Sequence, residues 1–416
     1  MTKKLAEVAF SSEWFLAKMF HALEESEIRE LFELKTIAGR QPDKEAAIRR
    51  MLELRSEKEN ENVHMDYARR NGSAEIQSLS SLEAMLRGNK LDYFVVDERT
   101  GTIDDKIFDN CDGIYISTNN ATHAKLILQA AERGIPVLCE KPLCVLLDEN
   151  LRATDSQLVE IRSLVNRNIV LLDAEHYSYK AAAQNFYRNI ENILHGREIV
   201  KIKGEIIECD SPSKGRNLKL LSKKSRTGLL TDTGVHPLSF VANLGYYAVP
   251  EDAEYGIFEG IDVEAGKRVA YEAETSCKAT YVLHPDKTSQ KRVIRDGAKF
   301  ELEVEKFGQY RRLGKSKKLV LTLSDNSTLT LDFDDKEGKI CEDANGIIIP
   351  HRPITPVNPS EYINILQEFN RAIDNPSYHA LTDFRNSIRT LQSIYETYKL
   401  RQITENQNRK IHYETN

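Results

Sequence analysis

The sequence has no long apolar run and no excess of positive charge, and both absences limit what the chain can be. No stretch approaches the roughly 18 consecutive apolar residues that a membrane-spanning helix needs. The formal net charge is −6, so a surface that attracts nucleic acid or anionic lipid is not indicated. We therefore expect a chain that binds neither membranes nor nucleic acid.

Cysteine pairs are missing as well. The 6 cysteines are scattered along the chain, and Cys139 and Cys144 are too far apart for a CxxC motif. Because neither a zinc site nor a disulfide framework is indicated, we expect no bound metal and reduced thiols. The opening residues also lack the apolar core of a signal peptide. Together these features predict a cytoplasmic protein.

The third absence is glycine close to the N-terminus. A buried strand is predicted over Ala6–Phe10, and nucleotide-binding folds place a glycine-rich turn after such a strand, where backbone amides approach a pyrophosphate. Here the segment Ser11–Leu16 contains no glycine and carries Glu13. A carboxylate next to a pyrophosphate repels it unless the side chain points away. The turn is therefore the weakest part of a nucleotide-binding interpretation.

The 416 residues that are present suffice for two domains. The first part mixes apolar runs with amphipathic segments, whereas the sequence from Val200 onward alternates apolar and polar residues, which is typical of an antiparallel sheet. Two helices with apolar spacing close the chain. The main predicted helices are Phe15–Glu25, Glu45–Arg69, a serine-capped helix starting at Ser80, His123–Arg133, Asp155–Asn166 and two helices within 361–400; the main predicted strands are Phe32–Ala38, Leu91–Val96, Ile169–Leu172, Val200–Ile207, Ala273–Val282, Lys299–Val304, Leu319–Leu323 and Ser327–Phe333.

The clearest pattern is a strand–helix–strand unit in the first part. Gly113–Ser117 reads as a buried strand, His123–Arg133 as an amphipathic helix, and Ile135–Cys139 as the following strand. Such a unit is a right-handed parallel crossover. Ligands bind beyond the carboxyl ends of these strands, which places Ser117–Asn120 and Glu140–Pro142 where a ligand is expected.

Two short segments carry the groups for alcohol oxidation. The first is Cys139-Glu140-Lys141-Pro142, whose lysine can stabilise an alkoxide; the alternative is a surface lysine in a salt bridge. The second contains Asp232 and His236, four residues apart, where the imidazole can exchange a proton near neutral pH and the carboxylate can bind a hydroxyl or orient the imidazole. The alternative there is a helix cap followed by a structural histidine.

Together these segments resemble a known family. The segments Ile114–His123, Ala130–Gly134, Cys139–Leu143 and Leu230–Pro237 are similar to the core signatures of the Gfo/Idh/MocA oxidoreductases, the glucose–fructose oxidoreductase and inositol dehydrogenase relatives. The closing stretch Glu361–Leu400 is similar to the terminal helices of that family. The match is patchy but runs through most of the chain in the same order.

The resemblance implies an α/β Rossmann-like N-terminal domain, 1–174, and an α+β C-terminal domain, 175–416, with a large, mostly antiparallel open sheet. It implies NAD or NADP as cofactor, a sugar, cyclitol or similar polyol as substrate, and a homodimer or homotetramer. It also implies a cis peptide between Lys141 and Pro142. Lys141, Asp232 and His236 are then the catalytic residues.

The same resemblance suggests which residues face the cofactor. Aligned with the family, the glycine turn is replaced by Ser11, Glu13 and Leu16. Arg40, which ends the second strand where an acid would bind the ribose of NAD, favours NADP by pairing with a 2′-phosphate; the alternative is an ordinary loop arginine. The expected cofactor-binding residues are Ser11, Ser12, Arg40, Thr118, Asn120, His123 and Glu140, of which His123 reads more simply as packing the cofactor loop.

Substrate contacts are expected from Tyr179, Lys180 and Arg226. Arg226 is the last of six basic residues in a stretch, 211–231, that contains no acid. This stretch either clamps an anionic substrate such as a phosphorylated or nucleotide-linked sugar or is a solvated loop. Two other functions remain open: a non-catalytic relative that acts as a sensor or partner subunit after losing the glycine turn, and a lyase or hydrolase that keeps its NAD as a redox relay.

Overall fold

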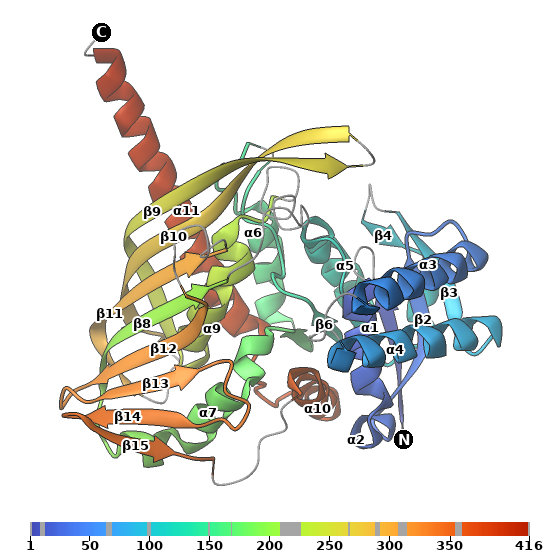
Figure 1. Cartoon of the computed structure of the whole chain (residues 1–416), viewed down its shortest axis with the longest axis horizontal. Helices are drawn as coiled ribbons and strands as arrows, with labels where there is room; N and C mark the ends of the chain where they lie inside the picture. Colours follow the sequence, from blue (N-terminus) through green and yellow to red (C-terminus); the bar gives the residue numbers. More distant parts are fainter. Residues whose placement is uncertain are drawn as a thin grey trace. The chain divides into compact units, whose positions relative to one another are not determined.

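The computed structural model describes residues 2–8, 13–63, 69–97, 101–148, 150–167, 169–208, 226–264, 267–287, 292–306, 314–353 and 360–414. The chain forms two compact units, each assembled from three segments (Figure 1). The first unit takes Met1–Cys144, Glu160–Ala174 and Ser360–Asp383, and the second takes Val145–Val159, Glu175–Pro359 and Phe384–Asn416. These units are discontinuous, whereas the predicted domains are contiguous, so the domain boundaries stay a prediction.

The first unit is built on a seven-stranded sheet in the order β4-β3-β2-β1-β5-β6-β7. All neighbouring strands pair in parallel except β4, which pairs antiparallel with β3 at one edge. The elements are β1 (Lys3–Val8), α1 (Glu13–Glu24), α2 (Ser26–Arg29), β2 (Phe32–Gly39), α3 (Lys44–Val63), α4 (Arg69–Arg87), β3 (Asp92–Asp97), β4 (Thr102–Ile103), η1 (Asp105–Phe108), β5 (Gly113–Ile116), α5 (Asn120–Glu132), β6 (Val137–Cys139), η2 (Ser163–Asn166), β7 (Leu171–Asp173) and α10 (Glu361–Asp374), with α6 (Ser156–Arg162) crossing the division.

This strand order is that of a Rossmann fold. The order reverses between β1 and β5, and the carboxyl ends at such a reversal are where nucleotides bind. The β5–α5–β6 crossover is parallel, as predicted. Asn119 caps α5, since its Oδ1 accepts a hydrogen bond from the Ala121 amide at 3.1 Å, and Gly134 follows the helix with a φ of 68°. Local sequence therefore sets both ends of this helix.

Helix α10 comes from the end of the chain and completes the core of the first unit. Its Phe369 stacks on Phe32 of β2, with ring centroids 5.9 Å apart. Gly113 of β5 lies under the same ring, because a Cβ at that position would come within 3.1 Å of Phe369. The sheet around β1 therefore needs a residue without a side chain at this point.

The second unit is built on an eight-stranded sheet in the order β15-β14-β13-β12-β8-β11-β10-β9. Only β8 and β11 pair in parallel, so the predicted mostly antiparallel sheet is confirmed. The elements are η3 (His176–Tyr179), α7 (Ala181–Leu194), β8 (Ile199–Ile207), the π-helical turn η5 (Leu230–Gly234), α9 (Val235–Asn243), β9 (Tyr246–Glu264), β10 (Lys267–Pro285), β11 (Ile294–Glu305), β12 (Ser316–Leu323), β13 (Thr328–Asp332), β14 (Ile340–Ala344), β15 (Ile347–His351) and α11 (Phe384–Glu414).

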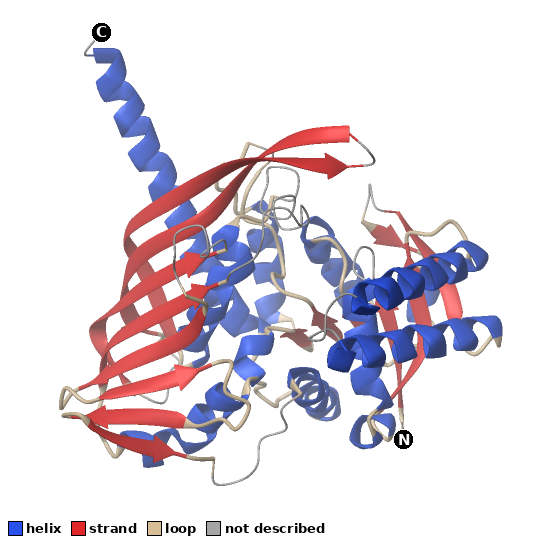
Figure 2. Cartoon of the chain, in the orientation of Figure 1, coloured by secondary structure: helices blue, strands red, loops and turns tan. Residues whose placement is uncertain are grey.

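Period-two alternation gives this sheet one apolar face. Leu319, Leu321 and Leu323 of β12 are fully buried, and the residues between them are partly exposed. Helices α7, α9 and α11 lie on the apolar side (Figure 2). The other side carries lysine–glutamate pairs such as Lys278 with Glu303 at 3.0 Å. The alternation therefore determines which face of the sheet the helices pack against.

Several predicted elements are wrong or missing. Ser80 does not start a helix, because α4 runs through it from Arg69; serine is tolerated inside helices as well as at caps, so it is a poor boundary signal on its own. The predicted helix Glu45–Arg69 is confirmed by α3 as far as Val63, and residues 64–68 lie outside the described residues. The long strand β9 and the short strands β14 and β15 were not predicted. Pro250 lies within β9, and proline weakens the strand signal.

Two observations concern the environment expected for the chain. Where the structure describes the chain, no helix is both long enough and apolar enough to cross a bilayer. Cys111, Cys139, Cys144, Cys277 and Cys341 are free thiols. The sixth cysteine, Cys209, lies outside the described residues. A cytoplasmic location stays a prediction.

Candidate active site

His236 lies at the start of α9, directly after a π-helical turn. The turn Leu230–Gly234 brings the chain close to the sheet, and a Cβ at Gly234 would lie 2.8 Å from Leu230 Cδ2, so a side chain there would require Leu230 to shift. The imidazole that follows is almost entirely buried, with 5% of His236 exposed. The Thr-Asp-Thr-Gly-Val-His motif thus places a histidine in the interior of the second unit.

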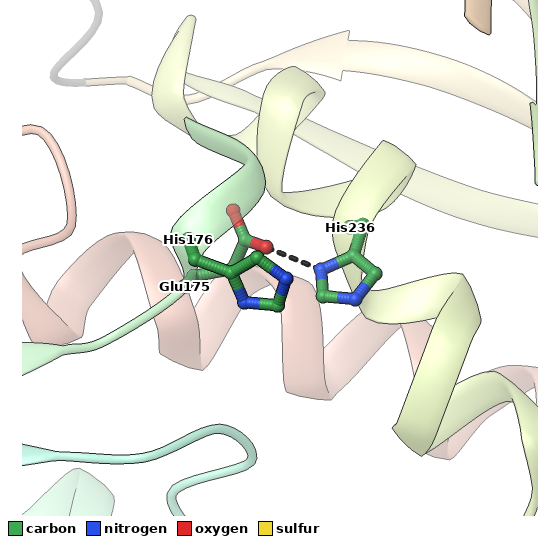
Figure 3. Close-up of side chains that lie close together, drawn as sticks. All are labelled: Glu175, His176 and His236. Atoms are coloured by element: carbon green, nitrogen blue, oxygen red, sulfur yellow. Dashed lines mark hydrogen bonds and ion pairs between the residues drawn. The ribbon is translucent and has the colours of Figure 1, made fainter. Parts of the chain in front are cut away.

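The Nδ1 atom of His236 is hydrogen-bonded to Oε1 of Glu175, from a different element (Figure 3). Glu175 caps η3, accepting bonds from the amides of Tyr177 at 3.1 Å and Ser178 at 2.8 Å, and from Ser178 Oγ at 2.6 Å. Burial raises the pKa of this carboxyl, while the nearby His176 and the hydrogen bonds oppose the rise. With Nδ1–H donated to the carboxylate, the lone pair of the neutral ring lies on Nε2.

Tyr177 covers one face of the His236 imidazole. The two rings are stacked, with centroids 3.9 Å apart and planes 14° from parallel. The Nζ atoms of Lys180 and Lys317 lie 5.1 Å and 5.6 Å from the Tyr177 ring centroid. The imidazole is therefore fixed by a carboxylate at its edge and by a ring on its face.

Asp232, the other predicted catalytic residue of the second unit, belongs to a chain of ion pairs. Its Oδ2 lies 3.4 Å from Nζ of Lys306, which also pairs with Glu208, and Glu208 pairs with Lys317 at 2.8 Å. Burial opposes ionisation of Glu208, but the two lysine charges outweigh it and lower its pKa to about 2. Asp232 is thus held by a cation that is itself held by a carboxylate.

Lys141 belongs to the first unit, at the end of β6. The peptide between Lys141 and Pro142 is cis, as predicted. The preceding Glu140 is buried, and its Oε1 accepts hydrogen bonds from Tyr115 at 2.6 Å and Tyr362 at 3.3 Å. Burial raises the pKa of Glu140, and the tyrosine bonds and Lys141 counteract it. This carboxylate, predicted to bind cofactor, is committed to two tyrosines.

A second buried carboxyl, Glu7 of β1, lies close enough to Glu140 to influence it. Glu7 is 0% exposed, and neither carboxyl oxygen has a hydrogen-bond partner in the described part of the chain. Burial, and then the charge of Glu140, raise the pKa of Glu7 well above its ordinary value. Burial therefore favours the protonated form of Glu7.

His123 links the ends of two parallel strands within the first unit. Its Nδ1 lies 2.7 Å from the carbonyl oxygen of Pro142, and its Nε2 lies 3.1 Å from that of Thr118. The side chain is 0% exposed, and burial lowers its pKa, while the two carbonyl contacts act to raise it. His123 thus ties the residues after β5 to the cis-proline segment.

The remaining predicted cofactor residues have different positions. Arg40 is exposed directly after β2, Asn120 is half-buried at the first position of α5, and Thr118 is buried with its hydroxyl 2.8 Å from that of Thr122. Ser11 and Ser12 lie outside the described residues, so the altered turn is not tested. The structure brings Thr118, His123 and Pro142 into contact, and Glu140 precedes this cluster.

Among the predicted substrate residues, Tyr179 is buried and Lys180 approaches Tyr177. Arg226 has a φ of 56°, and its Nε donates to the carbonyl oxygen of Leu147 at 3.1 Å. Most of the basic stretch before it lies outside the described residues. Lys180 is linked to His236 through Tyr177, because its Nζ lies over the ring that stacks on the imidazole.

Sequence reasoning missed Glu175, Lys306 and Glu208. Glu175 is separated from His236 by 61 positions and Lys306 from Asp232 by 74, so no local pattern joins them. A signal was available for Glu175, because it follows the last strand of the first sheet, where functional side chains are expected. No sequence signal pointed to Lys306 or Glu208.

Comparison with known proteins gives a consistent result. Residues 38–156 match the Gfo/Idh/MocA family model, described as an oxidoreductase family with an NAD-binding Rossmann fold. Over 54 residues the chain is 44% identical to inositol 2-dehydrogenase 4 of Saccharopolyspora erythraea. That match covers 13% of this chain and spans 16% of the length of the relative.

Solved structures resemble the chain over nearly its whole length. Levoglucosan dehydrogenase in complex with NADH aligns with a TM-score of 0.65 at 15% identity, covering 95% of this chain and 98% of that one. UDP-N-acetylglucosamine 3-dehydrogenase of Acidithiobacillus ferrooxidans aligns with a TM-score of 0.59 at 13% identity, covering 96% and 97%. An oxidoreductase of Agrobacterium radiobacter in complex with NAD+, L-tartaric acid and magnesium aligns with a TM-score of 0.61 at 14% identity, covering 96% and 97%. At these identities the likeness shows the fold.

Proposed function

We propose that this chain is a Gfo/Idh/MocA-type oxidoreductase, since residues 38–156 match that family model, and that it transfers hydride between a nicotinamide cofactor and a secondary alcohol or ketone. The observation that carries the proposal is the buried pair of Glu175 and His236. A carboxylate at Nδ1 fixes the tautomer and stabilises the imidazolium that forms when Nε2 takes a proton. A histidine held only for packing does not need a desolvated carboxylate.

In this mechanism His236 accepts the hydroxyl proton during oxidation and returns it during reduction. Lys141 donates a hydrogen bond to the substrate oxygen and stabilises its developing negative charge. Asp232, positioned by Lys306, binds a neighbouring hydroxyl of the substrate. The nicotinamide, when bound, supplies the site that gains or loses the hydride. Glu175 keeps the imidazole in one orientation throughout.

The cofactor is NAD or NADP. Thr118 and Asn120 follow β5 at the start of a helix, which suits hydrogen bonding to the nucleotide. His123 contacts the carbonyl oxygen of Thr118, and Glu140 accepts hydrogen bonds from Tyr115 and Tyr362. We propose that these contacts hold the cofactor-binding residues in place. Ser11 and Ser12 take the place of the usual glycine turn, and the exposed Arg40 after β2 favours a 2′-phosphate and hence NADP.

The substrate is a sugar, cyclitol or related polyol. The names of the similar proteins, an inositol 2-dehydrogenase, a levoglucosan dehydrogenase and a UDP-N-acetylglucosamine 3-dehydrogenase, support this class. Tyr179, Lys180 and Arg226 are the proposed substrate contacts, and Lys180 and Arg226 suit a substrate with an anionic substituent. We further propose a cytoplasmic homodimer or homotetramer, in keeping with the family.

The test is a screen of the purified chain for reduction of NAD and NADP by inositols, anhydrosugars, sugar phosphates and nucleotide sugars. Once a substrate is found, His236→Gln should lower kcat by about 10²–10⁴-fold and Lys141→Met by about 10²–10³-fold, with circular dichroism unchanged. Equal turnover in His236→Gln would remove the proposed base. A chain that binds neither nucleotide by calorimetry would instead be the non-catalytic relative that the altered N-terminal turn suggests.

Production of free NAD(P)H separates the proposed dehydrogenase from an enzyme that keeps its NAD as a redox relay. The dehydrogenase yields one reduced nicotinamide for each substrate oxidised. A redox relay converts substrate with no net change in nicotinamide. A product assay that is independent of nicotinamide absorbance is therefore run in parallel.

A further inference from the structure

The hydrogen-bonded pair of Glu175 and His236 has a third side chain of metal-binding type beside it, His176. Glu175, His176 and His236 each present one ligand atom, and these three atoms lie within 4.8 Å of one another (Figure 3). Glu175 and His176 are consecutive at the start of η3, and His236 is the second residue of α9. The cluster therefore joins two elements that each have a defined backbone.

The geometry is within reach of a tetrahedral metal ion. Zinc bonds to imidazole nitrogen and carboxylate oxygen at about 2.0–2.2 Å, which places neighbouring ligand atoms about 3.4 Å apart in a tetrahedron. The observed limit of 4.8 Å leaves about 1.4 Å to close. His176 is partly exposed and can supply that movement by rotating its side chain, whereas Glu175 and His236 are 1% and 5% exposed.

Glu175 has the supporting contacts that a metal-binding carboxylate usually has. Two amides and the Ser178 hydroxyl hold it, and Asn243 Nδ2 in turn donates to Ser178 Oγ at 2.9 Å. Such outer contacts fix the orientation of a ligand before the ion arrives. The ligand set is thus partly ordered before any metal binds.

The ligand types select among ions. Two imidazoles and one carboxylate suit zinc and its neighbours in the first transition row, whereas magnesium and calcium prefer oxygen ligands alone. Three protein ligands also leave one tetrahedral position open. Partly exposed His176 marks the side from which an ion would enter.

We propose that Glu175, His176 and His236 form a binding site for a divalent transition-metal ion, with zinc as the favoured ion, and that occupancy inhibits the enzyme. The ion takes the place of the proton on Nδ1 of His236, and this proton moves to Nε2, so the ring stays neutral. The inhibition rests on the proposed function, because a metal-bound His236 no longer accepts the substrate proton. The binding site itself does not depend on that function.

Metal binding is tested on the full chain after removal of metal with a chelator. Calorimetric titration with zinc should give one ion per chain, and cobalt should give the visible absorption of a tetrahedral N/O site. His176→Ala should weaken zinc at least about tenfold, and His176→Gln repeats the test if the alanine variant misfolds. The matched control is His284→Ala, since His284 also pairs with a carboxylate, Asp296, at 2.9 Å but lies at the surface.

The results separate the metal site from the dehydrogenase. Unchanged zinc affinity in both His176 variants, or magnesium binding as tightly as zinc, would overturn the site even if NAD(P)H is produced. A tenfold loss confined to the His176 variants would support it even if no turnover is found. Where turnover is measurable, zinc should inhibit the wild type and the His284 variant but not His176→Ala. Equal zinc inhibition of all three would place the inhibitory ion elsewhere and contradict the proposal.

Discussion

Tyr177 lies flat against His236, with ring centroids 3.9 Å apart and planes 14° from parallel. The tyrosine is itself held edge-on by Phe333, at a centroid distance of 5.1 Å. Since an imidazole ring that is stacked on one face and bonded at Nδ1 has little freedom to turn, Tyr177 completes the restraint that Glu175 begins.

Replacing Tyr177 with leucine removes this flat face. We expect Tyr177→Leu to lower the free energy of unfolding by about 2–3 kcal/mol and to reduce kcat about tenfold, because a stacked aromatic pair adds about 1 kcal/mol to its burial. Tyr177→Phe keeps the ring and should cost less than about 1 kcal/mol. Urea unfolding and steady-state kinetics measure the two effects. Equal losses in both variants would assign the role to the hydroxyl.

Gly228 is expected to be a sensitive glycine of the second unit. It has a φ of 66°, and a Cβ there would lie 2.4 Å from Tyr398 Oη and 2.9 Å from Leu147 Cδ1. Gly346 also has a positive φ, 83°, but nothing within 4 Å of its Cβ position. We expect Gly346→Ala to cost about 1 kcal/mol and Gly228→Ala about 3 kcal/mol or more. Comparable melting temperatures in the two variants would contradict this difference.

Glu208 should contribute to stability in acid. Because its pKa is lowered from 4.5 to about 2, its contribution is complete above pH 4.5 and is lost as the pH falls toward 2. Glu208→Gln should reduce the free energy of unfolding at neutral pH by about 3 kcal/mol and flatten its fall across this window. Glu301→Gln is the control, since Glu301 pairs with Lys201 at 2.6 Å where both are 45% exposed and should contribute less than about 1 kcal/mol.

Glu7 should act in the opposite direction. Its folded pKa is raised, so the folded protein loses stability as the pH rises from the unfolded value toward that raised pKa. Glu7→Gln removes this component and should stabilise the protein by about 1–3 kcal/mol at pH 8 relative to pH 5. Urea unfolding at both pH values measures it, with exposed Glu33→Gln as the control. A wild-type pH dependence that survives in Glu7→Gln would contradict the assignment.

The sequence predicts the regular parts of this fold well because their causes are local. The β5–α5–β6 crossover follows from apolar spacing and a cap at each end, and the alternation in β12 follows from one buried face. Strand β9 was missed because Pro250 interrupts its pattern; its stability comes from pairing along nearly its whole length with β10. Tertiary pairing overrides a weak local signal there.

The candidate site could be predicted only in part. His236 and Asp232 are found through their motif, but the groups that orient them are distant in sequence. The partners of Glu175 and Lys306 could not be predicted, because nothing in the sequence around a glutamate or a lysine indicates which distant residue it will contact after folding. The proposed metal site also has no local signature. The expectation of no metal rested on cysteine spacing, whereas His176 and His236 come from distant parts of the sequence.

The origin of α10 has a consequence for biosynthesis. Its residues, Glu361–Asp374, leave the ribosome long after the strands that they cover. Until then the nascent first sheet has Phe32 without its stacking partner and Glu140 without the hydroxyl of Tyr362. Until α10 is synthesised, the first unit exposes the surface that this helix covers, and chaperones and proteases can bind it during most of translation. Truncation anywhere before α10 should therefore yield an aggregation-prone fragment.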